Sequence, residues 1–166
     1  MVHGAWGASL IDVPTVYLDA DAAPNKDLVL GAAARYRLKV VAVSGSALWS
    51  LSGKPGVEVV VAGGAPDAAD REIVRRLAKG DLVLTADLPL AREALARGAR
   101  VLDFRGDELT EENIHDRLAT RDLLDSLRST GQLEPGAGGP SALTPADRRR
   151  FAAALDRVFA AVARGR

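Results

Sequence analysis

The segment TVYLDADAAP, residues 15–24, decides how the fold of this chain is interpreted. It is a short apolar run that ends in two aspartates, Asp19 and Asp21, and is then closed by Pro24. Carboxylates are rarely buried unless they have a partner. A buried strand that ends in two carboxylates therefore indicates that its carboxyl end lies at the rim of a polar site.

Further short runs rich in Val and Leu follow, as is typical of strands buried in a parallel sheet. The sequence predicts strands at residues 13–19, 38–44, 57–62, 82–86 and 100–104. Helices are expected between most of them, at residues 24–36, 66–79 and 89–97, and Gly98 is the expected C-cap of the last. Residues 45–56 are expected to form a loop or a short helix. This alternation predicts a doubly wound, mostly parallel five-stranded α/β sheet.

After the fifth strand the pattern becomes helical. Thr110 is the expected N-cap of one helix, and a second cap at Thr120 is expected to restart it. Thr144 and Pro145 begin the final helix, with Asp147 at its third position. The apolar stripe of that helix, which we expect to pack on the sheet, contains Phe151, Leu155, Val158, Phe159 and Val162.

The predicted domain organisation follows from these elements. Residues 1–12 are expected to be a disordered extension, and residues 13–166 a single domain. Within that domain, residues 13–107 form the predicted α/β core and residues 108–166 an all-helical extension packed on it.

Composition limits the classes of function. At 166 residues and 48% hydrophobic content, the chain is long enough to bury a core. Lys and Arg total 22, as do Asp and Glu, so any binding of a polyanion must be local. The absence of cysteine excludes thiolate zinc ligands and fits a reducing compartment. Residues 1–12 resemble neither a signal peptide nor a membrane span, so we expect a cytoplasmic protein with no membrane partner.

Five aspartates are expected to meet at one edge of the sheet. In an open parallel sheet, ligands bind at the carboxyl ends of the strands, near the point where strand order reverses. Asp19 and Asp21 end the first predicted strand, and the fourth brings Thr85 and Asp87 to the same edge. Asp67 begins the helix after the third strand, and the spacing of Asp70 within that helix turns it toward the sheet.

Helix capping is the alternative interpretation of most of these acids. Asp67, Asp70 and Asp87 stand where carboxylates stabilise helix N-termini, and Asp21 precedes a helix that opens at Pro24. Asp19 lies within a strand, where no capping role is available. Two unit charges about 5 Å apart repel by roughly 3 kcal/mol at an effective dielectric constant of about 20. A convergent cluster therefore requires a cation or a shared proton.

The ligand types favour a hard cation and phosphate chemistry. Several carboxylates without Cys or His suit Mg²⁺ or Mn²⁺. Water held by such an ion attacks phosphorus centres, so phosphodiester hydrolysis is the expected reaction. Arg105 and Arg121 are candidates for holding the substrate's phosphates. The alternative is that these two arginines form ion pairs with Asp103, Asp107, Glu111 or Glu112.

Several segments resemble a known family, the YaiI/YqxD family of uncharacterised bacterial proteins. In chain order, from about residue 15 to residue 160, they are LDADAAP, PDAAD, GDLVLTADLPLA, GARVLDFRGDELTEENI, RDLLDSLR, and GGP ahead of FAAALDRV. The resemblance implies a PIN-like (Rossmannoid) nuclease fold. By this likeness Asp19, Asp67 and Asp87 form the catalytic, metal-holding core, and Asp21 and Asp70 are further ligands or orient water. RNA is the implied substrate, and a homodimer is one assembly open to such a domain.

The chain also departs from that family. Ala23 stands where the family usually has Cys, so no thiol is essential here. The segment DFRG replaces the usual NPRG or HPRG, so the membership of Asp103 in the site stays open.

Two other functions stay open. The DxD spacing also suggests a haloacid-dehalogenase-like phosphatase with Asp19 as nucleophile and Asp21 as acid, although Ala23 stands where that motif has Thr or Val. No late paired-aspartate segment follows a catalytic lysine. The other alternative is a PIN-like domain that binds RNA or protein without catalysis. An aromatic content of 4% disfavours a broad base-stacking platform.

Overall fold

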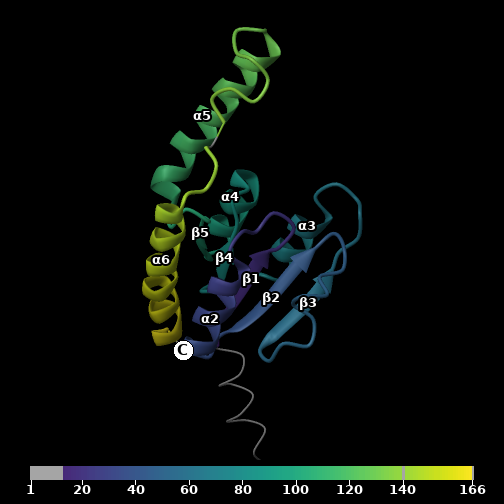
Figure 1. The fold of residues 1–166 in the computed structure, drawn as a ribbon, viewed down its shortest axis with the longest axis vertical. Coiled ribbons are helices and arrows are strands. Elements are labelled where there is room, and N and C mark those ends of the chain that lie inside the picture. Colours follow the sequence, from purple (N-terminus) through teal and green to yellow (C-terminus); the bar gives the residue numbers. More distant parts are fainter. Residues whose placement is uncertain (1–12, 140, 166) are drawn as a thin grey trace, which may run out of the picture.

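The computed structural model describes residues 13–139 and 141–165, and Figure 1 shows the arrangement of their elements. The extension predicted for residues 1–12 lies outside the described residues. The strands are β1 (Thr15–Asp19), β2 (Lys39–Ser44), β3 (Val57–Val61), β4 (Leu82–Leu84), β5 (Arg100–Leu102) and β6 (Glu108–Leu109). The helices are α2 (Lys26–Tyr36), α3 (Ala68–Arg76), α4 (Leu88–Ala96), α5 (Glu111–Ser129) and α6 (Pro145–Arg164).

The strand order creates a crevice between β1 and β4. The six strands are ordered β3-β2-β1-β4-β5-β6, and every pair except β5 with β6 is parallel. The chain builds outward from β1 to β3, then returns to place β4 on the other side of β1. The carboxyl ends of β1 and β4 therefore flank the point where strand order reverses, which is where open α/β sheets bind ligands.

Helices cover both faces of the sheet, so its central strands are apolar on both sides. On one face, β1 contributes Val16 and Leu18 to a core shared with α2 and α6. On the other face, Tyr17 belongs to a core shared with α3, α4 and the start of α5. The stripe predicted on the last helix is buried as expected, and Phe151 and Phe159 are fully buried.

The predicted fold class is confirmed, with two differences in detail. The structure adds β6, whose two residues pair antiparallel with β5 and are too few to give a periodic pattern. The restart predicted at Thr120 is wrong, because α5 runs unbroken through that residue. The N-caps predicted at Thr110 and Thr144 are confirmed, and both form capping boxes. None of the helices in the described ranges is both long and apolar enough to cross a membrane.

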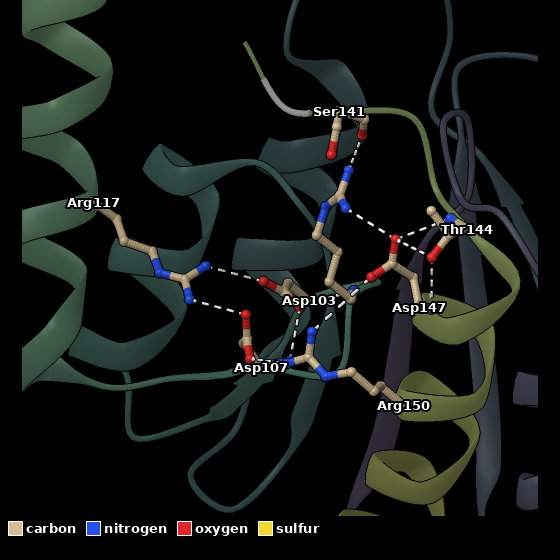
Figure 2. A network of polar contacts seen from close by, with 8 residues as sticks. Asp103, Asp107, Arg117, Ser141, Thr144, Asp147 and Arg150 are labelled. Atoms are coloured by element: carbon tan, nitrogen blue, oxygen red, sulfur yellow. Dashed lines mark hydrogen bonds and ion pairs between the residues drawn. The ribbon is translucent and has the colours of Figure 1, made fainter. Parts of the chain in front are cut away.

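A network of ion pairs fixes α5 and α6 to the turn between β5 and β6 (Figure 2). Arg117 of α5 contacts Asp103 and Asp107, each at 3.1 Å, and Arg150 of α6 contacts Asp107 at 3.0 Å. Asp103 also accepts hydrogen bonds from the backbone N–H groups of Arg105 and Asp107, both at 2.9 Å. The turn is thus held by charges from two helices as well as by its own backbone.

Gly106 is required at the centre of this turn. Its φ is +90°, and a Cβ atom at this position would lie 2.8 Å from the backbone oxygen of Arg150. We expect Gly106→Ala to destabilise the fold by about 2 kcal/mol or more, because it combines backbone strain with a clash against α6. Denaturant unfolding followed by circular dichroism measures this loss.

The matched control is Gly31→Ala within α2, where a Cβ would have only ordinary contact with Arg35 at 3.6 Å. This change is expected to stabilise the protein by about 0.5–1 kcal/mol, since alanine favours a helix over glycine. Equal effects of the two substitutions would contradict the assigned role of Gly106.

Candidate metal site at the β1–β4 crevice

A buried threonine connects the two strands that flank the crevice. Thr85 follows β4, is fully buried, and donates a hydrogen bond from its hydroxyl to Oδ2 of Asp19 at 2.7 Å. The same hydroxyl accepts the backbone N–H of Asp87 at 3.0 Å. One side chain therefore fixes the carboxylate that ends β1 relative to the residue that begins α4.

Asp87 caps α4 and also borders the crevice. Its Oδ1 accepts the backbone N–H of Leu90 at 2.9 Å, so the capping interpretation holds for this residue. Its other oxygen, Oδ2, accepts no hydrogen bond within the described ranges, and the residue is only partly buried. Capping and ligand binding are therefore compatible for Asp87.

Asp21 is held toward β2 rather than toward α2. Its two oxygens accept hydrogen bonds from the hydroxyl of Ser44 and from the backbone N–H of Gly45, the latter at 2.9 Å. The cap expected from Asp21 is wrong, because Asn25 occupies the N-cap position of α2. Ser44 is fully buried at the end of β2, so Asp21 is anchored on the far side of Asp19 from β4.

Asp67 occupies the N-cap position of α3 without capping it. Its backbone is left-handed, with φ 59° and ψ 13°, and its side chain makes no capping hydrogen bond. The capping interpretation is therefore wrong for its carboxylate. A non-glycine residue at positive φ costs about 1 kcal/mol or more, and such strain is often retained at functional sites.

Asp70 carries the most strongly perturbed carboxylate of the group. It is half-buried on α3 and accepts no hydrogen bond within the described part of the chain. Burial and the negative charges of Asp87, Asp19, Asp67 and Glu93, in this order, raise the pKa of Asp70 to about 6. The inward orientation expected from its helical spacing thus brings it within electrostatic reach of both sides of the crevice.

Asp19 shares this environment. Burial raises the pKa of the Asp19 carboxyl, and the nearby charges of Asp87 and Asp21 raise it further. The hydrogen bond from Thr85 partly opposes these effects. Asp19, Asp21, Asp67, Asp70 and Asp87 therefore lie in one connected field of negative charge.

Sequence reasoning placed Thr85 with Asp87 at the carboxyl end of the fourth strand, as a polar residue that ends an apolar run, and missed one member of this site, Glu93. Glu93 gave no such signal, because it lies on the exposed side of α4 while Leu90, Ala91 and Ala94 are buried. Only the packing of α3 near α4 brings Glu93 within reach of Asp70.

The donor chemistry of the cluster fits a hard divalent cation, although the described part of the chain contains no preformed set of ligands. Within residues 13–139 and 141–165, no group of three or more Asp, Glu or His side chains is close enough to hold one ion. Magnesium usually keeps several waters and binds through one or two carboxylates, so it does not need such a set. Among the described residues, the carboxylates of Asp67 and Asp70 and one oxygen each of Asp19 and Asp87 accept no hydrogen bond, so they are suitable ligands.

A groove of about 770 Å³ begins at Asp87 and is bordered by four arginines: Arg105, Arg117, Arg121 and Arg128. Arg105 contacts Asp147 at 3.2 Å and the backbone oxygen of Ser141. Within the described residues, Arg121 has two long contacts on its own helix, with Asp122 at 3.4 Å and with Asp125 at 4.0 Å. Both arginines therefore form ion pairs, but with partners other than those expected from the sequence.

Asp103 lines the same groove and has a structural role. Both of its oxygens already accept hydrogen bonds, from the turn backbone and from Arg117. Asp103 therefore differs from Asp67 and Asp70, whose carboxylates accept no hydrogen bond within the described residues.

Comparison with known proteins identifies relatives of the chain. The model of the YaiI/YqxD family, described as uncharacterised, matches residues 17–161. UPF0178 proteins from two strains of Rhodopseudomonas palustris, TIE-1 and ATCC BAA-98 / CGA009, are each 43% identical over 151 residues. The alignment covers 91% of this chain and 93% of each relative. No solved structure matches. The resemblance predicted from the sequence is thereby confirmed.

The perturbed carboxylate gives a pH-dependent prediction. Folding raises the pKa of Asp70 from 3.8 to about 6, so ionisation of its carboxyl destabilises the folded state. This destabilisation is complete above about pH 6 and absent below about pH 3.8. We expect Asp70→Asn to raise the melting temperature at pH 8 by about 2–4 °C, after allowance for solvent screening. At pH 4 the difference from the wild type should disappear.

Asp27→Asn provides the control of opposite sign, because Arg148 lowers the pKa of Asp27. This variant should gain no stability at pH 8. The measurement is the melting temperature of both variants between pH 4 and pH 8. A stability gain for Asp70→Asn that does not depend on pH would contradict the repulsion assigned to its charged form.

The threonine bridge gives a second prediction. Thr85→Val keeps the shape of the side chain but removes the donor to Asp19 and the acceptor for the N–H of Asp87. We expect a loss of about 1–2 kcal/mol in the free energy of unfolding, because buried polar groups lose their partners. Thr120→Val on the exposed face of α5 should change this free energy by less than about 0.5 kcal/mol. Similar losses in the free energy of unfolding of the two variants would contradict the bridging role assigned to Thr85.

Proposed function

Because this chain belongs to the YaiI/YqxD family, which is described as uncharacterised, we propose its function from the chemistry of its own site. The protein is a Mg²⁺- or Mn²⁺-dependent nuclease that hydrolyses phosphodiester bonds, with RNA as its substrate. The observation that carries this proposal is the half-buried carboxylate of Asp70, which is surrounded by other acids and lacks a hydrogen-bond donor.

A purely structural role does not account for that carboxylate. Buried acids that only stabilise a fold are paired or hydrogen-bonded, as Asp103 is here. Asp70 instead faces further negative charge, which costs folding free energy unless a cation or a proton offsets it. Strongly perturbed carboxylates at a sheet crevice are typical of functional sites.

The acids divide into holding and proton-accepting roles. Asp19 and Asp87 would hold the ion across the crevice, with Asp67 and Asp21 at its rim. When bound, the ion supplies a polarised water and offsets charge on the phosphate oxygens. Asp70, with a pKa of about 6, is mostly deprotonated at neutral pH and is suited to accept the proton of the attacking water.

The adjoining groove supports a phosphate-bearing substrate. A chain with no net charge needs a local source of positive potential to attract a polyanion. Four arginines border the groove that begins at Asp87, so positive charge lies next to the acids. The choice of RNA as the substrate, rather than another phosphodiester, rests on the likeness to PIN-like nucleases.

The proposal is tested first by metal binding. Calorimetric titration of Mn²⁺ should detect binding to the wild type and a loss of affinity of more than about tenfold in Asp19→Asn and Asp87→Asn. Asp122→Asn, an exposed carboxylate on α5, is the control that should bind normally. Circular dichroism establishes that each variant is folded. Equal or absent binding in all of them would contradict the metal site.

Cleavage of RNA is the second measurement that tests the proposal. With Mn²⁺ present, the wild type should cleave a mixed pool of single-stranded RNA, and Asp19→Asn and Asp70→Asn should be inactive. Binding of Mn²⁺ without cleavage of any RNA would favour a non-catalytic RNA- or protein-binding domain instead.

A further inference from the structure

The groove beside the acids has a composition of its own. Its floor is mainly apolar and includes Leu88, Pro89, Leu109, Leu124 and Leu143. Its volume of about 770 Å³ lies within the range of about 300–1,000 Å³ that is typical of pockets for small ligands. A groove of this size and composition accommodates a ligand with a few aromatic or sugar rings rather than an extended stretch of a polymer.

The positive charge of the groove comes mainly from one face of α5. Arg117, Arg121 and Arg128 follow one another at intervals of four and seven residues, which places them on the same side of the helix. Leu124 lies between the last two on the same stripe. At 1.5 Å per residue, Arg117 and Arg121 are separated by about 6 Å along the helix axis.

These arginines differ in how firmly they are already bound. Arg117 is committed to Asp103 and Asp107, and Arg128 contacts Asp125 at 2.7 Å and the backbone oxygen of Ala137. Arg121 has no contact shorter than 3.4 Å among the ion pairs of the described residues, and its side chain is 45% exposed. Arg121 is therefore the groove arginine with the greatest capacity to bind an external anion.

We propose that this groove binds one or two nucleotides of a single-stranded nucleic acid next to the phosphodiester that is cleaved. Arg121 contacts a phosphate, Arg128 adds positive charge farther along α5, and the apolar floor receives bases or sugars. Asp87 is shared by the groove and the acid cluster, so a strand in the groove leads directly to the acids. The cleavage part of this inference rests on the proposed nuclease function, whereas the binding part does not.

The apolar floor favours a single strand over a duplex. Base faces are accessible for apolar contact only where the bases are unstacked and unpaired. A duplex presents phosphates and sugars to a protein surface, and these gain nothing from contact with Leu124 or Leu143. Asp116 also lines the groove and weakens its attraction for phosphate, which is consistent with a short contact region.

Fluorescence anisotropy with short labelled oligouridylate and oligoadenylate tests the binding part. The titrations contain EDTA, so neither cleavage nor metal bridging contributes. We expect Arg121→Gln to weaken binding by about tenfold at low salt. Its plot of log affinity against log salt concentration should also be less steep by about one unit, because one phosphate contact is lost.

Two further variants act as controls. Arg149→Gln removes an exposed arginine on α6 outside the groove and should leave both quantities unchanged. Asp116→Asn removes the opposing charge in the groove and should tighten binding by about two- to threefold. Because Arg121 and Asp116 are both exposed on α5, neither change should affect folding.

The outcomes separate this inference from the nuclease proposal. Equal affinity and salt dependence in the wild type and Arg121→Gln, or tighter binding of a duplex of the same sequence, would overturn the groove assignment. If Asp70→Asn binds the oligonucleotides as the wild type does, while no protein cleaves them in Mn²⁺, the groove stands and the nuclease proposal fails.

Discussion

The hydrogen bond between Thr85 and Asp19 is the contact on which the geometry of the crevice depends. Strand order reverses between β1 and β4, so no loop joins their carboxyl ends directly. The Thr85 hydroxyl spans them, binding the carboxylate that ends β1 and the backbone at the start of α4. Because Thr85 is fully buried, its hydroxyl is shielded from competing water, and it holds the two sides of the crevice in register.

Around this bridge the protein distributes its charges unevenly. Asp81, at the opposite end of β4, is buried but fully engaged by the backbone N–H groups of Thr15 and Ala78. Asp103 is neutralised by Arg117 in the turn that clamps α5 and α6 (Figure 2). Asp70 has neither kind of partner and lies among like charges. The fold thus pairs Asp81 and Asp103 and leaves Asp70, a half-buried acid at the crevice, without a hydrogen-bond donor within the described residues, which is the pattern expected when a ligand completes the site.

Much of this architecture could be predicted from the sequence, and the failures have physical causes. Apolar runs and helix caps identified the five parallel strands and the N-caps Thr110 and Thr144, because these signals are local. β6 was missed because two residues carry no periodicity. The conformation of Asp67 was missed because the N-cap position does not reveal the left-handed backbone. Glu93 and the ion-pair partners of Arg105 depend on how distant helices pack, which no local spacing records.

The central claim is that the carboxylates at the β1–β4 crevice form one electrostatic cluster that is completed by a divalent cation. The most direct test is to follow the carboxyl carbon of Asp70 by NMR during a pH titration, with and without Mg²⁺. The account predicts that Asp70 titrates at about pH 6 in the metal-free protein and that saturating Mg²⁺ moves this titration to a clearly lower pH. Titration of Asp70 near its ordinary value of 3.8, unchanged by Mg²⁺, would contradict it.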